Sequence, residues 1–136
     1  MIIRKARTSD IQDCLNISRQ RDEKDKYWLK EDFLKNIKDK YAVFLVAEEK
    51  GSIFGYCIGY IVPTKRTEAM VHETRVDLNY RGRDIGTKLV NALCRALFNK
   101  NAKGVYALFE PKVKPFYINS CGFRQTGNWL EASRKK

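Results

Sequence analysis

The sequence predicts an α/β (α+β) fold in which a mixed, mostly antiparallel sheet is flanked by helices on both of its faces. Three observations lead to this prediction. Two β-rich runs are separated by the turn-forming residues "KGS". Several segments repeat apolar residues at intervals of four, as amphipathic helices do. A strand, a helix and another strand follow one another in the second half, which favours one parallel crossover.

The predicted element order is β-α-α-β-β-β-α-β-α-β, and a hairpin at the end of the chain would add one more strand. The chain has 136 residues, of which 43% are hydrophobic and 32% are charged. Such a chain is typical of globular proteins and can bury roughly two-thirds of its unfolded surface. Because no linker, repeat or low-complexity tract interrupts it, we expect residues 1–136 to form a single domain.

The first half of the chain predicts a short strand and two helices. Residues 1–6 alternate as a strand does, and Ser9 and Gln12 then have the spacing of a capping box. The first helix, within residues 8–20, has an apolar stripe formed by Ile11, Leu15 and Ile17. The second helix, within residues 28–40, has an apolar residue at every fourth position: Leu29, Phe33 and Ile37.

The middle of the chain predicts three strands and a long helix. Residues 41–49 and 53–63 form the two arms of the hairpin, and residues 68–78 form a third strand. The helix extends from Ile85 to about Phe98, because leucines recur there every four residues.

The last third of the chain predicts one strand at residues 103–110 and a short helix-like segment at residues 113–123. Gly122 is a helix-stop signal for that segment. Residues 123–133 then predict a final strand or hairpin, which could complete the sheet or pair with a second copy. The sequence therefore leaves open whether the protein forms a homodimer.

Four widely spaced cysteines and a single histidine argue against a metal site. No two cysteines form a CxxC pair, and each lies in or beside an apolar stretch, so we expect packed, reduced thiols. No apolar run approaches the ~20 residues of a membrane span. The N-terminus also lacks the apolar region of a signal peptide. These features predict a cytoplasmic protein without a membrane partner.

The net charge of +11 results from 27 basic and 16 acidic residues. Nucleic acid, a membrane surface or a phosphorylated cofactor would each suit this charge, although a lysine-coated surface explains much of it. The zinc-finger, helix-turn-helix and aromatic-rich RNA-binding patterns are all missing. We therefore do not expect a nucleic acid partner, but a basic nucleic-acid-binding protein remains an alternative.

The stretch "YRGRDIG" places two arginines and two glycines immediately before the long predicted helix. A helix N-terminus offers free backbone N–H groups and a partial positive charge, which attract phosphate oxygens. Glycines allow close approach of the backbone, and arginines add charge-assisted contacts. The pattern predicts a phosphate site, although a basic glycine turn is by itself a weak signal.

The stretch around this turn resembles the acyl-CoA binding motif of the GNAT acetyltransferase superfamily, Q/R-x-x-G-x-G/A. Arg81, Ile85 and Gly86 occupy the matching places, and Val76 matches an apolar residue near the end of the family's fourth strand. A second stretch, "PFYINSCGF", is similar to the family's F-Y-x-x-x-G-F but is one residue longer. Its matching residues are Phe116, Tyr117, Gly122 and Phe123. The element order is also the family's order.

The resemblance implies an acetyl-CoA-dependent N-acetyltransferase that moves an acetyl group to a primary amine by direct attack. Backbone N–H groups on the fourth strand would polarise the thioester carbonyl. The implied cofactor-binding residues are Thr74, Val76, Arg81, Gly82, Arg83, Asp84, Ile85, Gly86 and Thr87. The amine acceptor, a small molecule or a protein amine, is not specified, and the basic surface favours an anionic acceptor only mildly.

Two residues are candidates for proton transfer. Tyr117 stands where the family's general acid stands, and its alternative role is to pack on the sheet. His72 is the candidate base, since by two-residue alternation it shares a strand face with Thr74 and Val76. Glu73 then points to the other face. Glu68, Glu110 or a water chain are further candidates for the base.

Asp84 replaces the middle glycine of the family motif. Aspartate tolerates left-handed backbone better than most residues, so we expect the loop to keep its shape. Its carboxylate would oppose a pyrophosphate unless it turns away, to cap the helix or to pair with a basic neighbour. This substitution supports a further alternative, a non-catalytic GNAT-like regulatory module.

Overall fold

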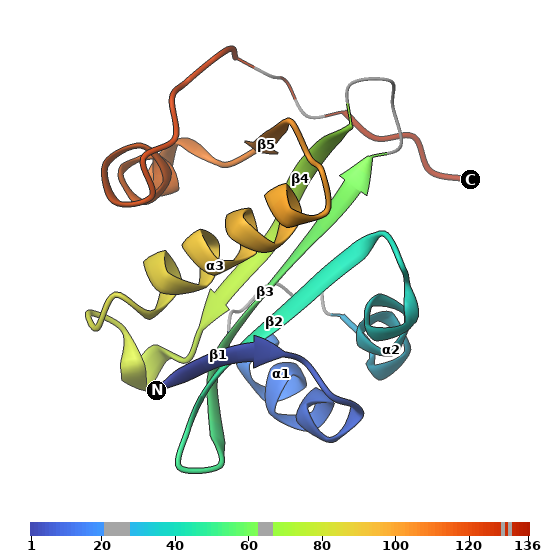
Figure 1. Cartoon of the computed structure of the whole chain (residues 1–136), viewed down its shortest axis with the longest axis vertical. Helices are drawn as coiled ribbons and strands as arrows, with labels where there is room; N and C mark the ends of the chain where they lie inside the picture. The colour runs from blue at the N-terminus through green and yellow to red at the C-terminus, as the bar shows by residue number, and fades with distance from the viewer. Residues whose placement is uncertain (21–27, 63–66, 129, 131) are drawn as a thin grey trace.

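The computed structural model describes residues 1–20, 28–62, 67–128, 130 and 132–136. Its five strands form one sheet in the order β1-β2-β3-β4-β5, with the bounds Ile2–Lys5, Ala42–Glu49, Ser52–Val62, Glu68–Val76 and Gly104–Ala107. Neighbouring strands are antiparallel except β4 and β5, which are parallel. The helices are α1 (Ile11–Ser18), α2 (Lys30–Lys38) and α3 (Ile85–Asn99). The predicted fold class and the parallel crossover are confirmed (Figure 1).

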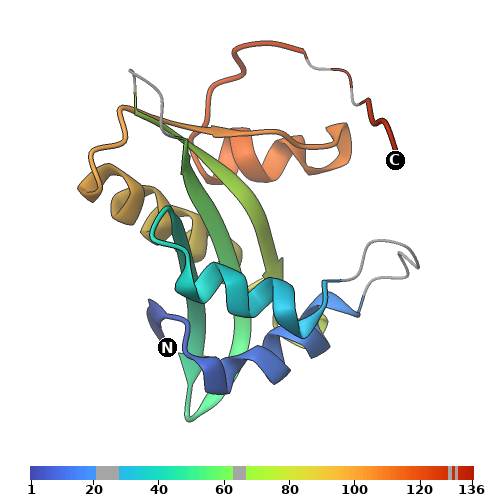
Figure 2. The same cartoon turned by 90° about the vertical axis from the view of Figure 1, so that its right-hand side faces the viewer.

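The sheet is covered on both faces, by α1 and α2 on one side and by α3 on the other (Figure 2). Phe33 of α2 and Tyr56 of β3 belong to the core beneath α1 and α2, whereas Cys57 of β3 and Leu89 belong to the core beneath α3. Because both faces of β2 and β3 are buried, these strands read as almost continuous apolar runs. The sheet therefore holds two separate apolar layers, one per face.

Two glycines of β3 allow α3 to approach the sheet closely. A Cβ atom on Gly55 would lie 3.0 Å from Leu89 Cδ1, and one on Gly59 would lie 3.2 Å from Leu93 Cδ1. Larger residues at these positions would push the helix outward. The N-terminus of α3 is thus held at a defined height over the sheet.

β4 contains one extra residue relative to β3. Ile58 pairs with Glu73 and Gly59 pairs with Val71, so His72 has no opposite partner. This is a β-bulge, and it interrupts the strict alternation of side chains along the strand.

The predicted start of the first helix is wrong. α1 follows a 3₁₀ turn at Thr8–Asp10, and Asp10 Oδ2 accepts the backbone N–H of Arg7 at 2.7 Å. The Gln12 side chain instead donates to Asn16 Oδ1 at 3.1 Å. Asp10 takes this role instead of the predicted Ser9 and Gln12 pair because its carboxylate also forms an ion pair with Arg4, whose Nη1 lies 2.7 Å away.

The predicted final strand is also wrong for the described residues, since none of residues 123–128, 130 and 132–136 is in a strand. Trp129 and Glu131 of that prediction lie outside the described residues. β5 is accordingly an edge strand, and it is shorter than the predicted 103–110. In the second predicted helix, Leu29 is exposed because it precedes the first turn of α2.

None of the described helices is long and apolar enough to cross a membrane. All four cysteines are free thiols, and Cys14 and Cys57 are buried as predicted.

Candidate active site

The turn before α3 has the backbone that its sequence predicts. Asp84 adopts the left-handed conformation with φ 57° and ψ 20°, and Gly82 also has a positive φ of 82°. The first hydrogen bond in the helix runs from the Lys88 N–H to the Asp84 carbonyl at 3.0 Å, and no side chain caps this end. The N–H groups of the first three helical residues are therefore available to an anion.

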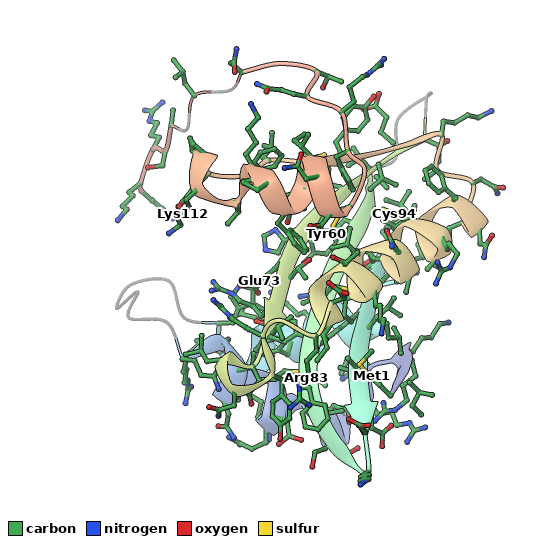
Figure 3. The ribbon with its side chains drawn as sticks, turned by 90° about the vertical axis from the view of Figure 1, so that its left-hand side faces the viewer. Met1, Tyr60, Glu73, Arg83, Cys94 and Lys112 are labelled. Atoms are coloured by element: carbon green, nitrogen blue, oxygen red, sulfur yellow. The ribbon has the colours of Figure 1, made fainter. Side chains whose placement is uncertain are left out.

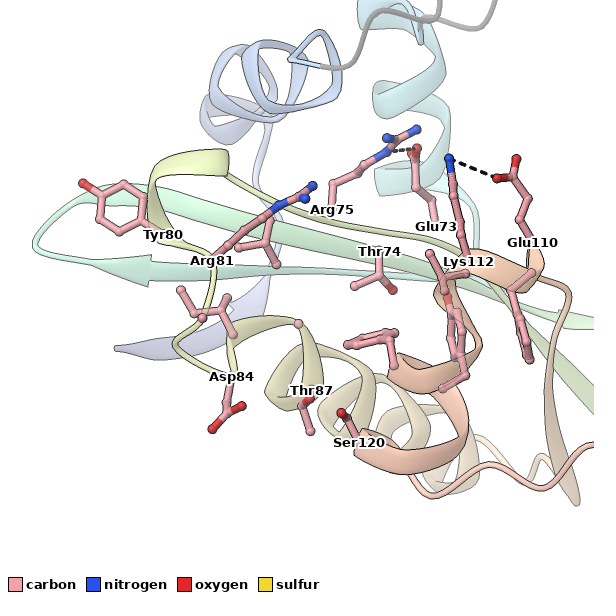
Figure 4. Close-up of a pocket in the computed structure, with 18 of the residues that line it drawn as sticks. Glu73, Thr74, Arg75, Tyr80, Arg81, Asp84, Thr87, Glu110, Lys112 and Ser120 are labelled. Carbon is pink, nitrogen blue, oxygen red and sulfur yellow. Dashed lines mark hydrogen bonds and ion pairs between the residues drawn. The ribbon is translucent and has the colours of Figure 1, made fainter.

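Asp84 and Arg81 lie on opposite sides of this loop. In Figure 4 the Arg81 side chain extends over the side that faces Glu73 and Arg75, while the Asp84 carboxylate points the other way. The carboxylate neither caps the helix nor forms an ion pair among the described residues. The carboxylate thus points away from Arg81 without making either interaction that the sequence suggested, a helix cap or an ion pair with a basic neighbour.

The first turn of α3 packs directly on the second motif. A Cβ atom on Gly86 would lie 3.1 Å from Phe116 Cε1 and 3.6 Å from Val76 Cγ2. Glycine is therefore required here by close approach rather than by an unusual φ angle. This contact joins the loop that precedes α3 to the segment that carries Tyr117.

The extra residue in "PFYINSCGF" is absorbed by a π-helical turn at Phe116–Ser120. The Cys121 N–H donates to the Phe116 carbonyl at 3.0 Å, which is the i to i+5 spacing of a π-helix. The Phe123 N–H then donates to the Tyr117 carbonyl at 2.9 Å, and Gly122 has a φ of 71°. The helix stop predicted at Gly122 is confirmed, since Gly122 follows the C-cap residue with the positive φ that is common there.

A cleft of about 560 Å³ lies between β4, the loop that precedes α3 (the α3 loop, residues 80–84) and residues 108–120. The pairing of β4 with β5 ends at Val71 and Ala107, although β4 itself continues to Val76. One backbone edge of residues 72–76 therefore faces this cleft instead of another strand. Glu73 of β4 and Lys112 of the segment after β5 both line it (Figure 3). Among the sequence-predicted site residues, the cleft is lined by His72, Thr74, Val76, Arg81, Gly82, Asp84, Ile85, Gly86, Thr87 and Tyr117.

Arg83 is the one predicted site residue that does not line the cleft. Its guanidinium lies over the ring of Tyr80, at 5.1 Å from the ring centroid. This cation–π contact braces the loop from outside.

The model of the Acetyltransferase (GNAT) family matches residues 7–123 of this chain. The chain belongs to the GNAT acetyltransferase family. Members of this family are acetyl-CoA-dependent acetyltransferases. A comparison with curated protein sequences found no match.

Solved structures with the same GNAT fold span nearly the whole chain. A putative acetyltransferase from Agrobacterium tumefaciens is 23% identical, with a TM-score of 0.85 and coverage of 98% of this chain and 100% of that one. Glucosamine-6-phosphate N-acetyltransferase from Arabidopsis thaliana is 20% identical, with a TM-score of 0.79 and 98% coverage of both. AAC(6')-Iy, solved with the bisubstrate analog CoA-S-monomethyl-acetylneamine, is 14% identical, with a TM-score of 0.84 and coverage of 99% and 98%. At these identities the likeness shows the fold.

In this GNAT protein, Tyr117 is fixed by three aromatic rings. Its ring stacks on Phe109 at 4.8 Å and meets the rings of Phe116 and Phe123 at 5.0 Å and 5.6 Å. Burial raises the pKa of the phenol, and the nearby Thr74 hydroxyl opposes part of that shift. No hydrogen bond of normal geometry joins the two groups, however. Thr74 Oγ1 is buried without a hydrogen-bond partner among the described residues.

His72 does not share a face with Thr74 and Val76, so that prediction is wrong. Its ring lies 5.3 Å from the ring of Trp28 and 5.4 Å from the ring of Tyr60, both of which pack on the core beneath α1 and α2. The bulge explains the change, because one inserted residue shifts the alternation. His72 still lines the cleft.

Glu73 has partners that the sequence did not reveal. Its carboxylate accepts a hydrogen bond from the Tyr56 hydroxyl at 3.0 Å and one from Arg75 Nε at 2.7 Å. The three side chains meet only because β3 and β4 pair in this register, and no sequence motif marks that pairing. Of the other predicted carboxylates, Glu110 lines the cleft beside Lys112 whereas Glu68 does not.

Proposed function

We propose that this protein transfers an acetyl group from acetyl-CoA to a primary amine by direct attack of the amine, with Tyr117 protonating the departing thiolate. The observation that carries the proposal is the shared cleft. Free N–H groups at the start of α3, the open edge of β4 and the Tyr117 phenol all line one cavity. Family membership gives the reaction class, and this arrangement supports the assignment of the parts.

The α3 loop would hold the cofactor's pyrophosphate. The N–H groups of Ile85, Gly86 and Thr87 supply donors at the positive end of the helix, and Arg81 adds a cation on the cleft side. Arg83 contributes charge from outside the cleft and steadies the loop. Val76, Gly82 and Asp84 shape its wall.

The Thr74 hydroxyl supports the fit between the cleft and the acyl-thioester end of the cofactor. A buried hydroxyl without a partner is uncommon in a folded protein, and here it lies beside Tyr117 in the cleft. A polar atom of the cofactor's acyl-thioester end would satisfy it. The open edge of β4 supplies further main-chain donors and acceptors along the same wall.

Acetyl-CoA supplies an activated acyl group whose leaving thiolate is stabilised by a proton. Tyr117 would give that proton. Burial raises the pKa of its phenol above the usual value, so the hydroxyl stays protonated at neutral pH. The same desolvation would make a thiolate in the cleft more basic, which keeps the two groups matched for proton transfer.

His72 would accept the proton of the attacking ammonium. It is the only histidine in the chain, and neutral imidazole is an effective base near pH 7. The rings of Trp28 and Tyr60 hold its ring at the edge of the cleft. Glu110 or a water chain are the alternatives for this role.

Substituting Tyr117 with phenylalanine tests the acid directly. Because three neighbouring rings hold the aromatic ring, Tyr117→Phe removes the hydroxyl and preserves the packing. We expect kcat to fall by about 100-fold, as for loss of a general acid. The Kd for acetyl-CoA, measured by isothermal titration calorimetry, should change by less than about threefold.

Unchanged kcat in Tyr117→Phe would remove Tyr117 as the acid. If the wild-type protein bound no acetyl-CoA in the calorimeter, the catalytic proposal would fail and a regulatory module would be the better description.

Substituting His72 with glutamine tests the base. Glutamine keeps a polar side chain of similar size but cannot titrate near neutral pH. We expect kcat/KM to fall by about 10- to 100-fold at pH 7.5. A variant that kept the wild-type rate would transfer the role to a carboxylate or to water.

A further inference from the structure

A second cavity lies next to the active-site cleft. It has a volume of about 390 Å³ and is lined by Trp28, Asp32, Lys35, Asn36, Asp39 and Tyr60. We call it the α2 pocket. The imidazole of His72 separates it from the cleft, since that ring lines the cleft and lies against the rings of Trp28 and Tyr60. A molecule whose amine reached His72 from the cleft would have this pocket directly beyond it.

The polar atoms of the α2 pocket are mainly hydrogen-bond acceptors. Asn36 Nδ2 donates to the Asp32 carbonyl at 2.7 Å, so its Oδ1 is left to accept the hydroxyl of Tyr60. The phenolic hydrogen is thereby used, and the phenolic oxygen keeps its lone pairs. Among the described lining residues, Lys35 is the one cationic donor.

The two aspartates of the α2 pocket are held in place by the backbone. Asp32 Oδ2 accepts the Leu29 N–H at 2.7 Å, and Asp39 Oδ1 accepts the Tyr41 N–H at 2.8 Å. Each carboxylate can present its second oxygen to a ligand. Positioned acceptors of this kind suit a donor-rich cation.

The field at Tyr60 is negative although the whole chain is basic. Burial is the largest cause of the raised pKa of the Tyr60 phenol, and the carboxylates of Asp39, Glu73 and Asp32 raise it further. Two carboxylates of the lining, those of Asp32 and Asp39, thus stand against the single cation of Lys35, whereas Glu73 lies outside the lining and is paired with Arg75. The local charge is opposite in sign to the net charge of the chain.

The remaining walls of the α2 pocket are aromatic. Trp28 is fixed by its contact with Phe33, at 5.0 Å between ring centroids, and the ring of Tyr60 lies 5.4 Å from that of His72. Aromatic faces beside carboxylates bind ammonium groups well, because the ring quadrupole adds to the charge attraction.

We infer that the α2 pocket binds a second ammonium group of the acceptor, so that the preferred acceptor is a diamine or polyamine. The inference rests on the proposed acetyl transfer, with one amine at His72 and the other in the pocket. A second neutral or anionic group would meet two carboxylates and the lone pairs of Tyr60, with Lys35 as the one cationic donor among the described lining residues. The pocket therefore selects acceptors by their second charge.

The test compares three acceptors of one chain length that differ in that second group: 1,4-diaminobutane, 1-aminobutane and 4-aminobutanoate. Diamines from 1,3-diaminopropane to 1,8-diaminooctane then locate the best length. Release of coenzyme A gives kcat/KM for each. We expect the diamine of best length to exceed the monoamine by about tenfold, with the amino acid last. The preference should shrink as salt rises, because ions screen exposed charges.

Two substitutions with opposite expected effects on the preference for diamines test whether that preference depends on the pocket. Asp39→Asn keeps the acceptor for the Tyr41 N–H and removes one charge, so the ratio of kcat/KM for diamine over monoamine should fall by about fivefold. Lys35→Gln should raise that ratio by about twofold. Glu31→Gln is the matched control, because Glu31 is exposed on the same helix and does not line the pocket. It should leave the ratio unchanged.

Direct binding separates this inference from the proposed reaction. In calorimetry without acetyl-CoA, wild-type protein should bind the best diamine more tightly than Asp39→Asn does. If that difference appeared while no amine was acetylated, the pocket would stand and the proposed reaction would fall. Acetylation of monoamine and diamine at equal rates, or equal ratios in Asp39→Asn and wild type, would overturn the role of the pocket and leave acetyl transfer intact.

Discussion

At the scale of single residues, Asp84 occupies the most demanding backbone position of the cofactor loop. Its left-handed conformation costs most side chains about 1–2 kcal/mol, and aspartate is among those that tolerate it. The carboxylate points to the side of the loop opposite Arg81 but stays next to the free N–H donors of the first helical turn. The residue thus keeps the shape of the loop and adds a negative charge near the phosphate site.

Asp84→Asn should separate the shape from the charge. Asparagine also tolerates the left-handed region, so the loop should persist while the repulsion disappears. We expect the Kd for acetyl-CoA to fall by about two- to fivefold at low salt, measured by calorimetry.

Asp84→Ala is the matched comparison, because alanine has neither the charge nor the tolerance for positive φ. Its unfolding free energy should fall by about 1 kcal/mol relative to Asp84→Asn. Weaker cofactor binding in Asp84→Asn would mean that the carboxylate contributes favourably to the site.

At the scale of elements, the position of α3 depends on small residues in β3. A Cβ atom on Gly55 would lie 2.9 Å from the Arg75 carbonyl oxygen and 3.0 Å from Leu89 Cδ1. The carbonyl belongs to the strand ladder and cannot move freely. Part of the adjustment must therefore fall on Leu89 and through it on α3, whose first turn carries the phosphate donors.

Gly55→Ala should reveal this coupling. We expect the free energy of unfolding, from urea denaturation, to fall by about 1–3 kcal/mol through overpacking. Acetyl-CoA binding should weaken at the same time. Ser52→Ala, at an exposed site on the same strand, should change stability by less than about 0.5 kcal/mol. A Gly55→Ala protein with wild-type stability would show that α3 can shift without lowering the free energy of unfolding.

The elements that the sequence predicts well are those marked by local signals. The apolar run of β2 and β3, the glycine turn between them and the leucine stripe of α3 each depend on neighbours in the chain. The features it misses depend on distant partners. Arg4 selects Asp10 as the cap at the start of α1, and pairing with β3 creates the bulge at His72.

The residues of the candidate site also divide into those marked by local signals in the sequence and those that depend on distant partners. The turn before α3 and Tyr117 belong to contiguous motifs, and the structure brings both to one cleft. Glu73 and the α2 pocket could not be assigned from sequence, because their partners come from segments far apart in the chain. Arg83 lies inside the motif and yet turns to Tyr80, since an exposed arginine can follow a nearby ring instead of the cleft.

At the scale of the whole molecule, the buried thiols tie folding to pH. Burial raises the pKa of Cys14 and of Cys57 from the usual 9.0 to far above it. Above pH 9 the unfolded chain therefore loses these protons while the folded chain keeps them. Since the folded state then binds more protons, stability falls as pH rises.

We expect the free energy of unfolding to be constant from about pH 7 to 8.5 and to decline above about pH 9. Each buried thiol should add about 1.4 kcal/mol per pH unit to this decline. Cys57→Ala should show a shallower decline, whatever its stability at neutral pH. Urea titrations at several alkaline values measure both slopes. Equal slopes in the variant and the wild type would contradict the buried-thiol explanation.

The bulge in β4 has a consequence for how this chain can change in length. Deleting His72 would restore the period of two between Val71 and Glu73, whereas inserting a residue elsewhere in the strand would reverse the side chains that follow it. The deletion would remove His72 and leave the side chains that follow on their present faces, whereas the insertion would exchange what the acceptor and the cofactor meet, even with every other residue intact. An insertion in this strand should therefore be tolerated less readily than a substitution.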